Sequence, residues 1–264
     1  MKKDLRSLHT FSVCAYGDSP YLEQCVRSVL SQTVKSTVIL CTSTPCESIE
    51  RIASKYHLML YVRKGESNIR EDWNFAIEKA NTPYVTVAHQ DDCYHRNYAK
   101  ELYKAIYEDP DFTMFYTGYR PIKEGKVATD INCLLRAILR FPMNFRILSD
   151  KCFFKKATLA FGNSICCPSV TYNLRKTGTP VFTSDMKFNI DWDTFLKFAS
   201  GWGRFAYNSK VLTYYRIHKD ATSKTFIEDN GRVKEDKDMF QKFWPKPVTR
   251  WLMKFYVKAY DTYR

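Results

Sequence analysis

The stretch "YVTVAHQDDCY", residues 84–94, joins an apolar segment to a run of polar side chains. Residues 84–88 predict a short buried β-strand, because they are rich in β-branched side chains and contain no charge. The strand leads directly into His89 and then into the adjacent carboxylates Asp91 and Asp92. Two neighbouring carboxylates at the end of a buried strand repel each other and lose hydration. They therefore require a partner, which is a divalent cation, a basic side chain or a helix N-terminus.

Outward from this stretch, strand-like apolar segments alternate with segments of helical periodicity. The expected strands are residues 10–15, 36–42, 58–62, 84–88 and 112–119, and the expected helices are residues 20–33, 47–56, 67–80 and 97–108. This alternation predicts an α/β fold, a Rossmann-type sandwich around a mostly parallel central sheet. Ligands of such sheets bind at the carboxyl ends of the strands, and residues 89–92 lie at one of these ends.

The second half of the chain is less regular. It predicts a helix and then a loop over residues 125–150, a loop and a strand over 162–176, and a helix over 191–200. The segment "RFAYNSKVLTYYRIH" (204–218) predicts two strands around a turn at Asn208 and Ser209.

Composition narrows the class of protein. The 264 residues are 45% hydrophobic and carry a net charge of +13, which favours nucleic acid, an anionic membrane surface or a phosphate-bearing substrate as partner. The nine cysteines are odd in number and include no C-x-x-C pair, which predicts reduced thiols in a cytoplasmic protein. The basic N-terminus has too short an apolar run for a signal peptide, and no apolar window is long enough to span a membrane.

Common phosphate and zinc motifs are absent. The chain has no G-x-x-x-x-G-K-[ST], no G-x-G-x-x-G and no H-E-x-x-H, and the turn after the first expected strand is "AYGDSP" (15–20). Carboxylate oxygens suit Mg²⁺ or Mn²⁺, and substrate phosphates commonly complete the shell of such a cation. A diphosphate substrate would fit both the acidic pair and the basic chain.

The order of motifs resembles the family-2-type inverting glycosyltransferases with the GT-A fold, over about residues 10–225. The matching segments are Ala15-Tyr16-Gly17 followed by "YLEQCVRSVLSQT", Gly65, "DWNFAIEKANTPYVTVAHQDD", Asp191-Trp192-Asp193 in "NIDWDTFLKFA", and Tyr215-Arg216-Ile217-His218 followed by "DATSKT". The resemblance implies a nucleotide-sugar-binding half (residues 1–125), an acceptor-binding half (126–225) and a C-terminal amphipathic helical tail (226–264).

The resemblance also implies roles for particular residues. Asp91, Asp92 and His218 would hold the metal, Mn²⁺ or Mg²⁺, and Asp191 would be the catalytic base, with Asp193 as a helix cap or salt-bridge partner. The residues expected to bind the nucleotide-sugar are Ala15, Tyr16, Thr42, Arg70, Asn74, Gln90, Asp91 and His218. Two departures stand out: His89 replaces the first Asp of the family's D-x-D motif, and "CTSTPCES" (41–48) replaces an Asp-rich turn.

The expected function is transfer of a sugar from a nucleotide-diphosphate sugar to an acceptor hydroxyl, with inversion and with a divalent cation. The resemblance favours bacterial-type surface polysaccharide or glycoconjugate assembly, a saccharide or lipid-linked saccharide as acceptor, and a cytoplasmic enzyme at the inner face of the plasma membrane. The alternatives are a nucleotidyltransferase of similar fold and a non-catalytic nucleic-acid-binding protein. The chain contains no recognised nucleic-acid motif.

The tail "VTRWLMKFYVKAYDTYR" (248–264) predicts a helix that begins after Pro247. One stripe of this helix would carry Trp251, Leu252, Phe255, Tyr256, Ala259, Tyr260 and Tyr263, and another face Arg250, Lys254 and Lys258. Two interpretations remain open. The stripe packs on the body of the enzyme or on a second subunit of a homodimer, or it lies in the interface of an anionic membrane.

Overall fold

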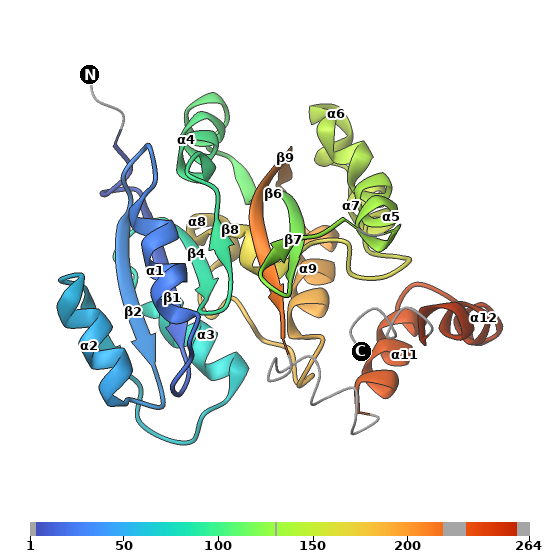
Figure 1. The fold of residues 1–264 in the computed structure, drawn as a ribbon. Coiled ribbons are helices and arrows are strands. Elements are labelled where there is room, and N and C mark those ends of the chain that lie inside the picture. Colours follow the sequence, from blue (N-terminus) through green and yellow to red (C-terminus); the bar gives the residue numbers. More distant parts are fainter. Residues whose placement is uncertain (1–3, 130, 219–230, 258–264) are drawn as a thin grey trace.

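The computed structural model describes residues 4–129, 131–218 and 231–257, which form an α/β structure around one curled sheet (Figure 1). The strand order is β3-β2-β1-β4-β8-β6-β9-β5, and β7 pairs with β6 beside this path. The first four strands are β3 (Met59–Val62), β2 (Thr37–Thr42), β1 (His9–Ala15) and β4 (Tyr84–His89), and they pair with one another in parallel. This half has the parallel arrangement that the alternating sequence predicts.

The remaining strands make the sheet mixed. They are β8 (Val170–Asn173), β6 (Phe112–Lys123), β9 (Arg204–Ile217), β5 (Cys93–Tyr94) and β7 (Lys126–Val127). Strand β8 runs antiparallel to both β4 and β6, whereas β6 and β9 are parallel to each other. The short strand β5 pairs with the end of β9 in antiparallel fashion, so the segment after β4 meets the end of the last long strand.

Helices cover both faces of the sheet. One apolar core lies between the sheet and α1 (Leu22–Leu30), α2 (Glu47–Lys55) and α4 (Tyr98–Glu108). On the other face, α3 (Ile69–Glu78), α9 (Ile190–Ser200) and α11 (Gly231–Gln241) enclose a second core. The remaining helical segments are α5 (Ile131–Arg140), η1 (Phe141–Asn144), α6 (Arg146–Ser149), α7 (Cys152–Ala157), η2 (Cys167–Ser169), α8 (Leu174–Thr177) and α12 (Lys246–Tyr256).

A buried chain of polar side chains crosses β1, β4 and β8. The His9 ring nitrogens lie 2.8 Å from the Ser36 hydroxyl and 2.9 Å from the Thr86 hydroxyl. Thr86 in turn lies 2.6 Å from the Thr171 hydroxyl, which also contacts the Tyr98 hydroxyl. Burial lowers the pKa of His9 to about 3, so the ring is neutral at physiological pH. Because each of these groups has a partner, the network favours one register of the strand that ends in the acidic pair.

The segment 204–218 differs from the sequence expectation. It forms the single strand β9 instead of two strands around a turn, and it runs parallel to β6 on both sides of Asn208. Over this stretch β9 has more residues than β6, and register shifts opposite Thr117 and Gly118 accommodate the difference. The bulge requires a residue without a side chain at position 118, because a Cβ there would lie 2.6 Å from the Ser209 carbonyl oxygen.

Helix α12 follows the predicted C-terminal helix for the residues that the structure describes. Leu252, Met253 and Tyr256 pack against the second core, and the Tyr256 ring lies 5.1 Å from the Phe240 ring. These contacts support packing of the stripe on the body of the protein, whereas Trp251 and Phe255 remain exposed. Ala259, Tyr260 and Tyr263 of the predicted stripe, and Lys258, lie outside the described residues.

We predict that Gly118→Val destabilises the protein, because the new side chain would displace the β9 backbone at the bulge. The expected loss of unfolding free energy is about 1–3 kcal/mol, the usual cost of overpacking, measured by chemical denaturation. Gly231→Ala is the matched control, since a Cβ at that exposed helix start meets no atom within 4 Å. Equal stability of the two variants would show that β6 and β9 tolerate a side chain at the bulge.

Candidate active site

The loops after β1, β2 and β4 are tied together by hydrogen bonds at the carboxyl edge of the sheet. The Gln90 side chain accepts a hydrogen bond from the Tyr16 N–H at 2.8 Å and donates one to the Tyr16 carbonyl oxygen at 3.0 Å. The Gly17 N–H donates to the hydroxyl of Thr44, whose own N–H donates to the hydroxyl of Thr42. Ala15 and Thr42 are buried, whereas the Tyr16 side chain is 62% exposed and offers a free aromatic face beside these loops.

Asp91 and His218 meet at the same edge, although 127 positions separate them in the sequence. The His218 Nε2 atom lies 3.2 Å from Asp91 Oδ2, and the Ser19 hydroxyl donates to Asp91 Oδ1 at 3.1 Å. Both ring nitrogens of His218 are buried: Nε2 has the Asp91 carboxylate beside it, and Nδ1 has no hydrogen-bond partner among the described residues. A buried ring nitrogen without a partner is costly, so this ring is suited to a ligand that supplies the missing interaction.

Asp92 lies deeper than Asp91 and is held by Arg216. The Arg216 N–H donates to Asp92 Oδ1 at 2.8 Å, and the Arg216 guanidinium donates to the Asp91 carbonyl oxygen at 3.0 Å. Burial raises the pKa of Asp92 to about 8, against the lowering effect of the hydrogen bond from Arg216. The guanidinium also lies over the Tyr21 ring at 4.3 Å, which fixes its direction.

His89 occupies the position of the missing first Asp and brings no charge. Its ring stacks on Trp73 with 4.8 Å between centroids, and its Nδ1 atom lies 3.9 Å from Asp92 Oδ2. Burial lowers the pKa of His89 to about 4, against the raising effect of the Asp91 charge. The ring is therefore neutral at physiological pH, so this edge of the site carries less negative charge than a complete D-x-D motif would.

The residues at this edge fit a divalent cation only when a substrate completes its shell. Within the described ranges there is no group of three or more His, Cys, Asp or Glu side chains that could hold a metal. Asp91 and His218 nevertheless offer an oxygen and a nitrogen donor beside each other. Mg²⁺ and Mn²⁺ commonly bind through one or two protein ligands together with substrate phosphates, which matches an incomplete protein shell.

Asp191 lies in the first turn of α9, where Trp192 anchors the helix. The Trp192 indole is fully buried and donates to the Leu159 carbonyl oxygen at 3.1 Å. Asp191 Oδ2 accepts from the Asn163 amide at 2.8 Å, and Oδ1 accepts from the Trp192 N–H at 2.8 Å. Burial raises the pKa of Asp191 to about 6, although these two bonds and the Arg232 charge act to lower it.

The neighbouring Asp193 forms a salt bridge with Lys242, as the sequence predicts for a structural residue. Cys166 links the two acidic regions. Burial raises the pKa of the Cys166 thiol well above its usual range, and the charges of Asp92 and Asp191 raise it further. Both acids therefore act in the same direction on this buried thiol, whereas Arg136 and Arg140 act to lower its pKa.

Arg70 and Asn74 of α3 contact a different segment from the other residues predicted to bind the nucleotide-sugar. The Asn74 amide exchanges two hydrogen bonds with the backbone of Phe182, at 2.7 and 3.0 Å. The Arg70 guanidinium donates to the Ser184 carbonyl oxygen and to the Asp185 carboxylate. Both side chains hold the segment 182–185, which leads towards the start of α9.

Asp72 is a central residue of this edge that no sequence pattern singled out. It accepts from the Arg63 guanidinium at 2.7 Å, the Ser43 hydroxyl at 3.0 Å and the Ser67 hydroxyl at 2.8 Å. It thereby joins the end of β3, the turn after β2 and the start of α3. In the sequence, an acid in the first turn of a helix is indistinguishable from an ordinary cap.

A second set of residues missed from the sequence lies on α11 and holds the start of α9. The Glu235 carboxylate accepts three successive backbone N–H groups, those of Lys187, Phe188 and Asn189, at 2.7, 2.8 and 2.9 Å. The neighbouring Asp236 accepts from the Asn189 side chain at 2.8 Å. These three N–H groups belong to the residues just before α9 (Ile190–Ser200), so a carboxylate from another helix fixes the segment that leads into Asp191.

Comparison with known proteins gives a consistent result. The family model described as "Glycosyl transferase family 2" matches residues 10–176, more than half of the chain. Glycosyltransferase GlyA of Streptococcus pneumoniae serotype 4 is 27% identical over 104 residues, which are 38% of this chain and only 15% of that relative.

Solved structures share the fold. The S. aureus TarS 1-349 structure in complex with UDP-GlcNAc is 14% identical with a TM-score of 0.65, over 96% of this chain and 73% of that one. The mannosyltransferase PcManGT from Pyrobaculum calidifontis, in complex with GDP-Man and Mn2+, is 16% identical with a TM-score of 0.60, over 96% and 69% of the two chains.

The curled mixed sheet has the GT-A-type fold of these solved transferase structures. The chain belongs to glycosyltransferase family 2. This membership selects glycosyl transfer over the nucleotidyltransferase and nucleic-acid-binding alternatives. None of the helices in the described part of the chain is both long and apolar enough to cross a membrane.

We predict that Glu235→Ala weakens the start of α9, because three N–H groups lose a charged acceptor at once. The unfolding free energy should fall by about 2 kcal/mol, the scale of hydrogen bonds to charged groups. The control is Asp238→Asn on the same helix, an exposed carboxylate that should change stability little. If both variants unfold at the same denaturant concentration as wild type, Glu235 is not a significant cap.

Proposed function

We propose that this chain transfers a sugar from a nucleotide-diphosphate sugar to an acceptor hydroxyl, with inversion, and that Mn²⁺ or Mg²⁺ is required. The observation that carries the proposal is the pairing of Asp91 with His218, two partly buried side chains of metal-ligating types that meet at 3.2 Å. This pair lies at the carboxyl edge of a sheet of the family-2 type, where nucleotides bind in related α/β proteins. In this proposal residues 1–125 bind the donor and residues 126–225 the acceptor.

The nucleotide would occupy the edge formed by Ala15, Tyr16, Thr42 and Gln90. The exposed Tyr16 ring is available to stack on a base, and Gln90 fixes the Tyr16 backbone beneath it. Arg70 and Asn74 would act by holding the segment 182–185 against the donor. The two solved structures named above were determined with UDP-GlcNAc and GDP-Man, which supports a nucleotide-sugar as the class of donor without selecting the base.

The diphosphate would bind beside Asp91 and His218. When bound, the divalent cation would offset the negative charge that develops on the departing diphosphate. Asp91 and His218 would hold this cation, and Asp92 would support them from below. Arg216 contributes by fixing the backbone of Asp91 and the carboxylate of Asp92, so the two acids keep their positions when the ligand leaves.

Asp191 would act as the general base. It would take the proton of the acceptor hydroxyl while that oxygen bonds to the anomeric carbon and the bond to the nucleoside diphosphate breaks on the opposite side, which gives inversion. A carboxylate with a pKa raised to about 6 is a stronger base than an exposed Asp and is still ionised at neutral pH. Asn163 and the Trp192 N–H keep it in one orientation.

The acceptor is proposed to be a saccharide or a lipid-linked saccharide of bacterial-type surface polysaccharide or glycoconjugate assembly. What supports a phosphate-bearing or membrane-borne partner in this chain is its net charge of +13.

We predict that Asp91→Asn abolishes the metal-dependent part of nucleoside diphosphate binding, because the variant loses the charged oxygen beside His218. The measurement is calorimetric titration of UDP and GDP with and without Mn²⁺, together with a thermal unfolding scan. Asp111→Asn serves as the control, since that exposed acid pairs only with Lys176 far from the edge. Unchanged metal-dependent affinity in Asp91→Asn would rule out this assignment.

We predict that Asp191→Asn leaves donor affinity nearly intact and lowers turnover by about 10²-fold or more, the scale of lost general-base catalysis. In the wild-type enzyme kcat/KM should fall as the pH drops below about 6, because Asp191 becomes protonated and can no longer accept a proton. Asp193→Asn is the matched control and should keep both turnover and pH profile. The opposite ranking of the two variants would identify Asp193 as the base.

A further inference from the structure

Large apolar side chains are exposed on α5, α6 and α7 and on the turn between them, which Figure 1 shows on the side of the protein away from α2. We define the apolar ridge as Leu134, Leu135, Ile138, Phe141, Ile147 and Phe153, whose side chains are 52–75% exposed. The first four lie at helical spacing on one face of α5 and the turn that follows it. Large exposed apolar residues gathered in this way mark an interaction surface, since scattered single residues are the norm on soluble proteins.

The opposite face of α5 is part of the wall of the active site. Arg140 is buried, its guanidinium lies over the Tyr119 ring at 4.6 Å, and it donates to the Ser164 carbonyl oxygen. Ser164 follows directly after Asn163, whose amide donates to Asp191. One short helix therefore separates the ridge from the loop that orients Asp191.

The ridge is surrounded by positive charge. Residues 131–161 contain six Lys or Arg and one acid, Asp150. Of the basic residues, Arg146, Lys151 and Lys156 are exposed, and the Arg146 guanidinium lies 3.2 Å from the Asp109 carboxylate. A twofold interface between two copies of the chain would bring these like charges together, whereas an anionic bilayer would complement them.

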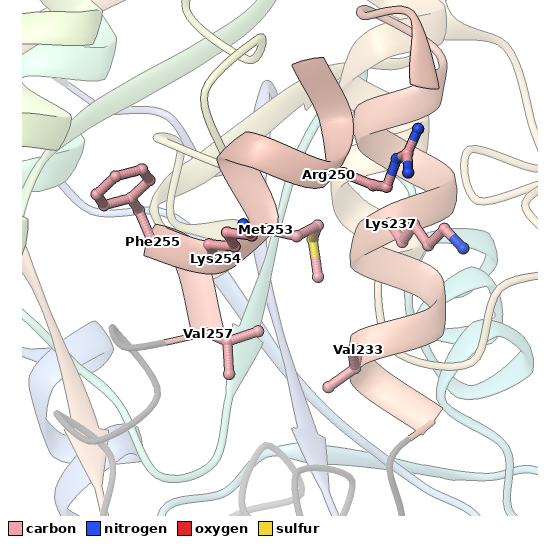
Figure 2. A pocket seen from close by; sticks show the side chains of 7 residues that line it. All are labelled: Val233, Lys237, Arg250, Met253, Lys254, Phe255 and Val257. Carbon is pink, nitrogen blue, oxygen red and sulfur yellow. The ribbon is translucent and has the colours of Figure 1, made fainter. Parts of the chain in front are cut away.

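The C-terminal helices α11 and α12 carry a second region in which apolar side chains lie beside basic ones. The groove between α11 and α12 has a volume of about 770 Å³ and is lined by Val233, Met253 and Val257 together with the cations Lys237, Arg250 and Lys254 (Figure 2). The turn that follows α7 contacts the residues just before α12, because the Trp244 indole donates to the Ala160 carbonyl oxygen at 2.7 Å. The groove and the ridge are thus carried by connected parts of the same half of the protein.

We propose that the apolar ridge is an interfacial membrane surface, which inserts its aliphatic and aromatic side chains into an anionic bilayer while Arg146, Lys151 and Lys156 contact the lipid headgroups. This arrangement is that of an amphipathic helix lying in the interface plane. The membrane proposal rests on the proposed function in one respect only. Because α5 belongs to the half proposed to bind the acceptor, the acceptor would be an amphiphile that presents its sugar hydroxyl from the bilayer.

The test is co-sedimentation of the full chain with vesicles that contain phosphatidylglycerol and with vesicles of phosphatidylcholine alone. Wild type should bind the anionic vesicles, and less so at high salt. Leu135→Glu combined with Ile138→Glu should lower the partition coefficient by at least about tenfold, because two apolar side chains no longer enter the lipid. Met59→Glu on the edge strand β3, where the native side chain is 63% exposed, is the matched control and should bind as wild type does.

The ridge variant should also keep Mn²⁺-dependent nucleoside diphosphate binding, which shows that it is folded. Vesicle binding needs neither donor nor turnover, so loss of the proposed activity with intact vesicle binding would contradict the proposed function alone. The membrane proposal is overturned if wild type does not bind anionic vesicles at low salt, or if the ridge variant binds as well as wild type. It is also overturned if sedimentation velocity shows a wild-type dimer that the ridge variant dissociates, since a second copy then covers the ridge.

Discussion

The contact between Arg216 and the acidic pair is the interaction on which the rest of the site depends. Two adjacent carboxylates follow a buried strand, and one of them is almost fully enclosed. Arg216 donates to the Asp92 side chain through its backbone and to the Asp91 carbonyl oxygen through its guanidinium. Because Arg216 lies at the end of β9, these bonds bring His218, two residues later, to Asp91.

The two halves of the sheet contribute different parts of the site. The parallel strands β3, β2, β1 and β4 align their carboxyl ends and so create the edge to which Tyr16, Thr42 and Gln90 belong. The antiparallel strand β8 joins this half to β6 and β9, and the loop before β8 carries Asn163 to Asp191. The cap from Glu235 then fixes the start of α9 from outside the segment that matches the family model. The site is therefore assembled from residues that are distant in the sequence and are held in place by strand pairing and hydrogen bonds.

Sequence reasoning succeeded where the signal is local. The strands and helices of the first half follow from periodicity, and the structure has them there. The roles that the resemblance implies for Asp91, His218 and Asp191 stay predictions. Sequence reasoning failed where the deciding contact is distant. Residues 204–217 form one strand because the Ser209 backbone approaches Gly118 closely. The roles of Asp72 and Glu235 depend on hydrogen-bond donors from other segments of the chain. The ridge on α5 could not be predicted either, because an amphipathic pattern does not reveal whether its apolar face is covered.

The central claim is that Asp91 and His218 together form the protein's share of a metal–diphosphate site. The most direct measurement is a crystal structure of the wild-type chain grown with Mn²⁺ and UDP, with the metal located by its anomalous scattering. The account predicts one manganese peak bonded to an Asp91 carboxylate oxygen, a His218 ring nitrogen and diphosphate oxygens. A manganese ion held by Asp92 and His89, or one bound while His218 faces away from it, would contradict the account.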